Sequence, residues 1–144
     1  MIVIASDHAG VDVKAAIVDR LRAAGLTVDD LGPDSAESVD YPDYAHRVAA
    51  RVADEPAARG ILICGTGLGM SMSANRHPGV RAALCHDAFT AAMARRHNDA
   101  NVLCLGARVL GPGVIEQVVD VFLATDFEGG RHQRRVAKIE PEER

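Results

Sequence analysis

Aromatic residues are scarce in this sequence, which has no tryptophan, two tyrosines and three phenylalanines among 144 residues. Because 48% of the residues are nevertheless hydrophobic, valine, isoleucine, leucine and alanine must supply the core. Apolar stretches are short, and none reaches the roughly 18 residues of a membrane span. The first residues, Met1–Ile4, lack the charged region of a signal peptide. We therefore expect a soluble, cytoplasmic protein with no membrane partner.

A strong excess of one charge is missing too. Sixteen basic and twenty acidic residues leave a net charge of −4, which argues against general nucleic-acid binding. Cys64, Cys85 and Cys104 form no pair with the spacing of a zinc or redox motif, so we expect reduced thiols and no metal. At this length a single domain, residues 1–144, can bury a core without disulfides, and residues 136–144 form a polar C-terminal tail.

Short apolar runs alternate with helical patterns along the chain. The runs predict five buried parallel strands, at residues 2–5, 26–31, 61–63, 80–84 and 101–105. Amphipathic spacing predicts helices between them, near residues 13–21 and 45–52 and over 87–97 and 112–124. Asp87 is a good helix N-cap, and Pro112 is a good first helical residue. This alternation predicts a three-layer α/β/α sandwich with a five-stranded, parallel, Rossmann-like sheet.

The most informative junction joins the run Ile61–Ile63 to the glycine-rich segment Cys64–Gly69. Glycines in such a turn let backbone N–H groups converge on an anion, and a following helix adds partial positive charge. A cysteine beside these donors is a candidate catalytic group, although a buried and inert thiol is the ordinary alternative. The pattern therefore predicts an anion site that contains a thiol.

Three familiar loops do not fit this segment. The phosphate loop of NTPases ends in a lysine, which is missing here. A cysteine phosphatase would place an arginine six residues after its nucleophile, where this chain has Met70. The dinucleotide fingerprint fails because Gly65, Gly67 and Gly69 are spaced by two throughout.

Residues that follow each strand are the next candidates, because open α/β sheets bind ligands beyond the carboxyl ends of their strands. These residues are 6–10, 64–69, 85–87 and 106–108. We expect them to lie along one rim. Asp7 and His8 belong to this group, although Asp7 could simply cap the next helix. Tyr41, in the polar loop 32–43, could cover a pocket.

Two further features lie late in the chain. His97 and Asn98 end a predicted helix, where a histidine commonly just complements the helix dipole. Arg131 and Arg135 are spaced i,i+4, so on a helix they would share a face and could grip a phosphate. A solvated basic face is the usual explanation of such a run.

Six motifs taken together resemble the ribose-5-phosphate isomerase B family. They are Ser-Asp-His-Ala-Gly (6–10), Asp-Tyr-Pro (40–42), Ile-Cys-Gly-Thr-Gly-Leu-Gly (63–69), Arg-His-Asn-Asp (96–99), Gly-Ala-Arg-Val (106–109) and Glu-Gly-Gly-Arg-His (128–132). They occur in the family's order and extend from about Ile2 to Val136. Galactose-6-phosphate and allose-6-phosphate isomerases share much of this pattern.

The resemblance implies a cofactor-free interconversion of D-ribose 5-phosphate and D-ribulose 5-phosphate through a cis-enediolate, a step of the pentose phosphate pathway. The alternatives are a six-carbon phosphate isomerase and a non-catalytic sugar-phosphate binding protein. The resemblance further implies a homodimer or tetramer whose sites combine residues of two subunits.

Residue roles follow from the same resemblance. Cys64 is the base that moves a proton between C1 and C2, with Thr66 beside it, and His97, aided by Asp7, opens the sugar ring. One subgroup of the family has Ser at the cysteine position and a Glu base further along the loop, so this chain is of the cysteine type. The remaining residues are implied to bind substrate: His8, Tyr41, Gly65, Gly67, Leu68, Gly69, Asn98, Arg108, Arg131 and Arg135. Among these, Asn98 and Arg108 are implied to serve the partner's site together with His97.

Overall fold

The computed structural model describes residues 1–142 and contains one parallel sheet with the strand order β2-β1-β3-β5-β4. The strands are β1 (Ile2–Ser6), β2 (Val28–Asp30), β3 (Arg59–Cys64), β4 (Ala82–Leu84) and β5 (Val102–Gly106). Each predicted strand is present, and the three-layer, Rossmann-like class is confirmed. The edge strands β2 and β4 are shorter than predicted, whereas the central β3 is longer.

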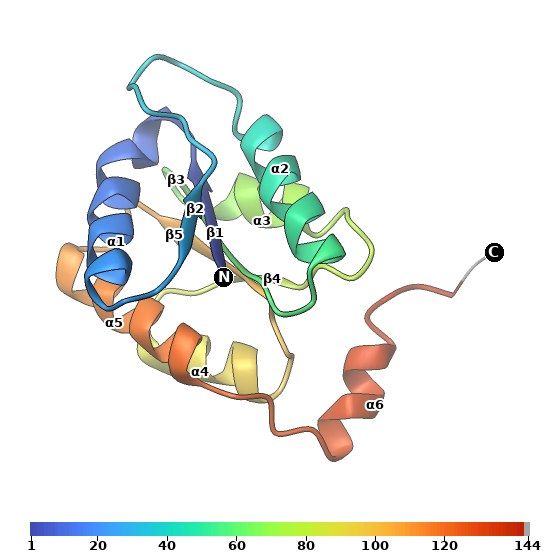
Figure 1. Cartoon of the computed structure of the whole chain (residues 1–144). Helices are drawn as coiled ribbons and strands as arrows, with labels where there is room; N and C mark the ends of the chain where they lie inside the picture. The colour runs from blue at the N-terminus through green and yellow to red at the C-terminus, as the bar shows by residue number, and fades with distance from the viewer. Residues whose placement is uncertain (143–144) are drawn as a thin grey trace.

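Helices cover both faces of the sheet (Figure 1). One face carries α1 (Val11–Ala23), α4 (Ala88–Arg96) and α5 (Pro112–Ala124), and the other carries α2 (Tyr41–Asp54) and α3 (Leu68–Ala74). A 3-10 turn, η1 (His8–Gly10), precedes α1, and α6 (Arg131–Ala137) lies at the periphery. The predicted helices over 87–97 and 112–124 are therefore confirmed to within one residue.

Alternating side chains of the central strands fill the two halves of the core. In β1, Ile2 and Ile4 join the cluster under α1 and α5, whereas Val3 and Ala5 join the cluster under α2 and α3. Each fully buried aliphatic side chain of this kind stabilises the fold by about 1.5–3 kcal/mol. The sheet is thus buried on both faces, as the near-continuous apolar runs indicate.

Local signals in the sequence explain where two of the helices begin. Asp87 caps α4, with its Oδ1 atom accepting a hydrogen bond of 2.7 Å from the Thr90 N–H. Hydrogen bonds from Thr90 lower the pKa of the Asp87 carboxyl, so the cap is anionic at neutral pH. Pro112 takes the first position of α5, where its missing N–H is harmless.

Because all five strands are parallel, the sheet has two chemically different edges. We call the edge where the strands end the carboxyl edge, and the edge where they begin the amino edge. Along β3, the distance from Arg59 at the amino edge to Cys64 at the carboxyl edge is about 16 Å at roughly 3.3 Å per residue.

The C-terminal segment lies against the amino edge. There the Glu128 N–H donates to the Arg96 carbonyl at 3.1 Å, and further along Glu140 accepts from the Gly79 N–H at 2.6 Å. The predicted polar tail, 136–144, thus starts inside α6, and its last residues, 143–144, lie outside the described part of the chain. Among the described residues, no helix combines the length and apolarity that crossing a bilayer requires.

Candidate active site

The segment Cys64–Gly69 forms a tight loop between β3 and α3. Cys64 is 5% exposed, and its Sγ atom accepts a hydrogen bond of 3.1 Å from the Gly67 N–H. Gly67 has φ 79°, a left-handed conformation that glycine adopts readily. The sulfur is therefore held in place by a backbone donor of its own loop.

Close packing fixes this loop against the neighbouring strands. A methyl group on Gly106 would lie 2.7 Å from the Thr66 carbonyl oxygen, and one on Gly67 would lie 2.5 Å from Leu84 Cδ1. A backbone hydrogen bond of 2.8 Å from the Ala107 N–H to the Cys64 carbonyl ties the loop to the end of β5. The loop has little room to move, so its N–H groups keep their directions.

Tyr41 lies over the far end of the loop. It begins α2 and is 41% exposed, and its ring is so near Gly69 that a methyl group there would come within 2.6 Å of Tyr41 Cζ. Only glycine fits beneath this ring. Tyr41 therefore contacts the loop directly, and its role in covering a pocket stays a prediction.

Asp7 and His8 reach the same edge from the end of β1. The Asp7 N–H donates to the Ile63 carbonyl at 3.0 Å, which places the β1 end beside the Cys64 loop. Asp7 Oδ1 accepts from the Ala9 N–H at 2.9 Å, so this residue does cap the following turn. His8 Nδ1 accepts from the Val39 N–H at 3.2 Å, which leaves Nε2 as the donor of the neutral ring.

Arg108 also lies at the carboxyl edge. Its backbone N–H donates to the Gly65 carbonyl at 3.0 Å, and its guanidinium Nη1 is 3.5 Å from the position that a Cβ on Gly65 would occupy. Thr66 is exposed beside it and accepts from the Leu68 N–H at 3.2 Å. Arg108 therefore covers its own chain's loop, whereas the resemblance groups it with His97 and Asn98 in the partner's site.

His97 lies at the opposite, amino edge. It follows the last residue of α4, and its ring stacks on His132 with 4.1 Å between ring centroids and 13° between planes. His97 Nε2 is 3.6 Å from Glu128 Oε1. Burial and the neighbouring His97 lower the pKa of His132, so His132 is neutral at pH 7.

The remaining predicted residues share the amino edge. Asn98 is exposed next to His97, and Arg131 and Arg135 are exposed on α6, whose helical geometry gives their side chains a common face. The described part of one chain thus divides the predicted site into two groups about one strand length apart. The common rim predicted for the residues after each strand is confirmed, and the late-chain residues are not part of it.

The cluster of His97, Glu128 and His132 at the amino edge accommodates a metal poorly. His97, Glu128 and His132 place three ligand atoms within 4.8 Å of one another. A ring nitrogen binds a metal in the plane of its own ring, and the two imidazole planes here are stacked almost parallel. The two rings therefore cannot both direct a nitrogen lone pair at one ion in this arrangement.

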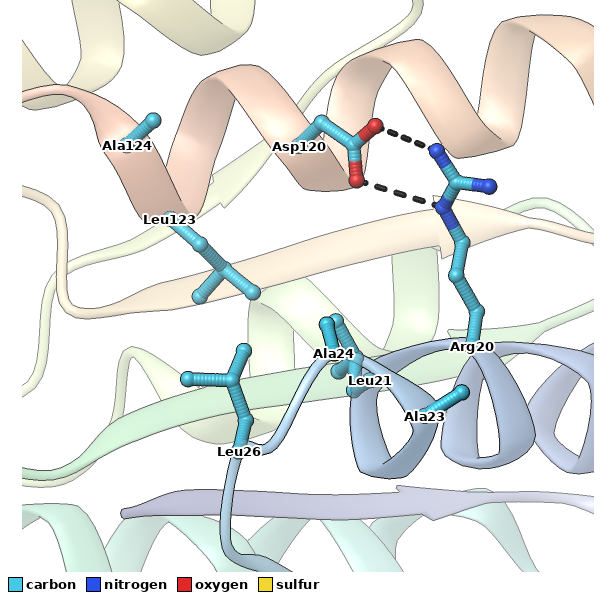
Figure 2. Close-up of a pocket in the computed structure, with 8 residues that line it drawn as sticks. All are labelled: Arg20, Leu21, Ala23, Ala24, Leu26, Asp120, Leu123 and Ala124. Carbon is cyan, nitrogen blue, oxygen red and sulfur yellow. Dashed lines mark hydrogen bonds and ion pairs between the residues drawn. The ribbon is translucent and has the colours of Figure 1, made fainter.

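A separate hollow of about 780 Å³ lies between α1 and α5, away from both groups (Figure 2). Its two charged residues pair with each other: the Arg20 guanidinium donates hydrogen bonds of 2.6 and 3.3 Å to the Asp120 carboxylate. The other lining side chains are aliphatic, and none is a nucleophile or a base. This hollow has the character of a packing groove between helices.

Together, the fold and the thiol-bearing loop define an α/β protein of the class in which loops after parallel strands form the ligand site. The chain belongs to the Ribose/Galactose Isomerase family, which matches residues 2–139.

Relatives of known structure agree along nearly the whole chain. The ribose-5-phosphate isomerase B of Clostridium thermocellum superposes with a TM-score of 0.94 and 50% identity, over 96% of this chain and 93% of that chain. The ribose-5-phosphate isomerase B of Mycoplasma genitalium, solved with bound ribulose-5-phosphate, gives a TM-score of 0.93 and 48% identity, over 96% and 92%.

Relatives with assigned names include two different activities. Ribose-5-phosphate isomerase B of Escherichia coli K12 is 47% identical over 92% of this chain and 89% of that protein. D-erythrulose-4-phosphate isomerase of Pectobacterium atrosepticum is 45% identical over 96% of this chain and 91% of that protein.

Proposed function

We propose that this chain is an aldose–ketose isomerase that interconverts D-ribose 5-phosphate and D-ribulose 5-phosphate. The observation that carries the proposal is the Cys64 Sγ atom, held at 3.1 Å by the Gly67 N–H inside a glycine loop at the carboxyl edge. Removal of a proton next to a carbonyl needs a base and also donors for the negative charge that develops on oxygen. This loop supplies both groups within a few residues.

In the proposed reaction Cys64, as thiolate, takes the proton from C2 of the open-chain aldose. The electron pair forms the C1–C2 double bond of a cis-enediolate, and backbone N–H groups of residues 65–69 donate to its oxygen. Cys64 then returns the proton to C1, while the hydroxyl proton moves from O2 to O1, which gives the ketose. Thr66, exposed beside the sulfur, contacts the sugar.

Ring opening and phosphate binding use residues of both edges. His97 protonates the ring oxygen with the aid of Asp7, and Asn98 binds sugar hydroxyls. The phosphate takes charge-assisted hydrogen bonds from arginine and histidine side chains: His8, Arg108, Arg131 and Arg135. Binding of this remote group orients the reacting carbons over Cys64.

A second copy of the chain is required by this mechanism, because one chain keeps His97 and Cys64 at opposite edges. We propose a homodimer in which the amino edge of each subunit completes the carboxyl edge of its partner. Large apolar side chains near the β4 side of the sheet support such an interface: Leu68 is 49%, Met72 68% and Phe89 71% exposed. All three cysteines are free, which fits a reducing compartment, and we place the enzyme in the cytoplasm.

The decisive assay compares sugar phosphates of different length. Purified protein is given ribose 5-phosphate, allose 6-phosphate, galactose 6-phosphate and erythrose 4-phosphate, and kcat/KM is measured for each. We expect ribose 5-phosphate to have the highest value. Comparable or faster turnover of another substrate would overturn the assignment, and binding without any turnover would indicate a sugar-phosphate binding protein.

A further inference from the structure

The turn between α4 and β5 contains an unusual backbone conformation directly after His97 and Asn98. Asp99 has φ 46° and is the one non-glycine residue with a positive φ among residues 1–142. Glycine, or less often asparagine, normally takes this left-handed position at the end of a helix. The contacts of the Asp99 side chain explain why an aspartate occupies this position.

That side chain connects two elements of the amino edge. Asp99 Oδ1 accepts from Arg95 Nη1 at 3.0 Å, and Asp99 Oδ2 lies 3.4 Å from Arg81 Nη2. Arg81 Nε also donates to the Asp99 carbonyl at 2.8 Å. The carboxylate thus joins the last turn of α4 to the residue that precedes β4.

Arg95 is itself firmly placed. It is 4% exposed, and it donates to the Ala100 carbonyl at 2.6 Å and to the Thr125 carbonyl at 3.1 Å. The Ala100 N–H closes the turn onto the Ala94 carbonyl at 2.9 Å. Through Arg95, the Asp99 carboxylate is therefore tied to the turn that carries His97 and Asn98.

Charge at this edge makes the carboxylate more important. Arg59 begins β3 nearby, and burial, followed by repulsion from Arg95, lowers its pKa, while Asp99 acts in the opposite direction. Asp99 is therefore a counter-charge shared by several arginines. Its neutralisation would leave them repelling one another around the turn.

We infer that Asp99 is a positioning residue: its carboxylate, bound by Arg81 and Arg95, sets the turn that presents His97 and Asn98 to the active site. This role rests on the proposed function, in which His97 opens and closes the sugar ring. Asp99 acts through these two neighbours and does not itself touch the substrate.

Two substitutions separate the backbone from the charge. Asp99→Asn keeps the size of the side chain and the tolerance for a left-handed φ but loses the charge, whereas Asp99→Gly relieves the backbone and removes the side chain. Asp29→Asn is the matched control, because Asp29 accepts from Arg51 at 2.7 Å and is similarly exposed, far from either part of the site.

The kinetic measurement starts from ribulose 5-phosphate in D₂O and follows both net conversion and deuterium incorporation at C1. Proton exchange needs Cys64, whereas ring closure of the aldose comes later and needs His97. When closure slows, the bound open-chain aldose returns through the enediolate more often. Exchange per conversion then increases.

We expect Asp99→Asn and Asp99→Gly to slow net conversion by about ten- to a hundredfold and to raise the exchange-to-conversion ratio. Asp29→Asn should change neither quantity. Equal loss of exchange and conversion, or no loss, would overturn the positioning role.

An NMR measurement makes the test independent of catalysis. The ring proton shifts of His97 and His132 report their stacking, and we expect them to change in Asp99→Asn but not in Asp29→Asn. A wild-type protein that neither converts nor exchanges, together with this shift change, would reject the proposed function and retain the role of Asp99. Active protein with unchanged shifts would reject that role.

Discussion

The two edges of the sheet hold their functional groups by different means. At the carboxyl edge, the Gly67 N–H of a glycine-rich loop donates to the Cys64 sulfur, and the loop is packed so closely that Gly67 and Gly106 tolerate no side chain. At the amino edge, side chains from separate elements hold one another in place, as the stacked pair of His97 and His132 shows. The first arrangement is rigid and uses backbone dipoles, with the charged side chains of Asp7 and Arg108 beside it. The second is charged and depends on long-range contacts.

This difference shows which part of the reaction each edge suits. Fixed backbone dipoles stabilise charge that develops on one oxygen, so the loop suits the enediolate step. Charged side chains suit phosphate binding and proton delivery. Since about one strand length separates the edges in a single chain, the comparison predicts that catalysis needs two chains.

The largest expected effect comes from removal of the sulfur at the carboxyl edge. Cys64→Ala should lower kcat by about a hundred- to ten-thousandfold, the usual contribution of a positioned base, with little change in substrate binding. Cys85→Ala is the control, because burial raises the pKa of the Cys85 thiol to about 11 and keeps it protonated. Steady-state measurement of kcat and KM distinguishes the two variants. Near-normal kcat in Cys64→Ala would mean that another group is the base.

A smaller effect is expected from the arginines of the amino edge. Arg131→Ala and Arg135→Ala should each lose about 1.5–3 kcal/mol of charge-assisted hydrogen bonding, which raises KM roughly ten- to 150-fold. Arg134→Ala tests for a general charge effect, since Arg134 is exposed on the same helix and takes no part in the proposed phosphate contacts. Phosphate-free ribose should bind equally to all variants. If it binds more weakly to Arg131→Ala, the helix has a structural role instead.

Mixing inactive variants tests directly whether the two edges come from different subunits. Cys64→Ala and His97→Ala should complement each other, because a random mixture forms half mixed dimers with one intact site of two, or roughly a quarter of full activity. Cys64→Ala and Arg108→Ala should not complement, because both damage the carboxyl edge. No recovery in the first mixture, after subunit exchange has been demonstrated, would place His97 and Cys64 of one chain in the same site.

The smallest expected effect concerns pH and stability at the amino edge. The folded state lowers the pKa of His132, so the unfolded chain binds more protons below its ordinary value of 6.5. Stability should therefore be complete above about pH 6.5 and fall as the pH drops through the lowered value. Thermal melts from pH 7.5 to 5 should show a smaller decrease in Tm for His132→Gln than for wild type. His86→Gln, which changes an exposed histidine, should melt with the wild-type pH dependence.

The sequence predicts the carboxyl edge far better than the amino edge. Residues directly after parallel strands share one edge by geometry, so the proximity of Asp7, Cys64 and Arg108 follows once the strands are recognised. The stack of His132 on His97 joins positions 35 residues apart, and no periodicity or spacing in the sequence predicts this contact. Recognisable motifs contain Glu128, His132 and Asp99. The side chains that these residues contact, however, are known only once the elements have packed together.

The bounds of the strands are also predicted only in part from the sequence. The central strand β3 extends past its predicted run because Arg59 and Gly60 pair with β1, a contribution of the sheet and not of local propensity. The edge strand β4 keeps only Ala82–Leu84, since it has a partner on one side alone.

The first turn of α2 gives this protein a built-in optical probe. With no tryptophan in the chain, its two tyrosines dominate the near-ultraviolet absorption and the intrinsic fluorescence. Both stand in this turn: Tyr41 lies against Gly69, and Tyr44 lies under Arg47 at 4.7 Å from the guanidinium carbon to the ring centroid. Spectral changes of Tyr41 on ligand addition would therefore report on the thiol loop that its ring covers. Rapid-mixing experiments could follow occupation of that loop without any attached dye.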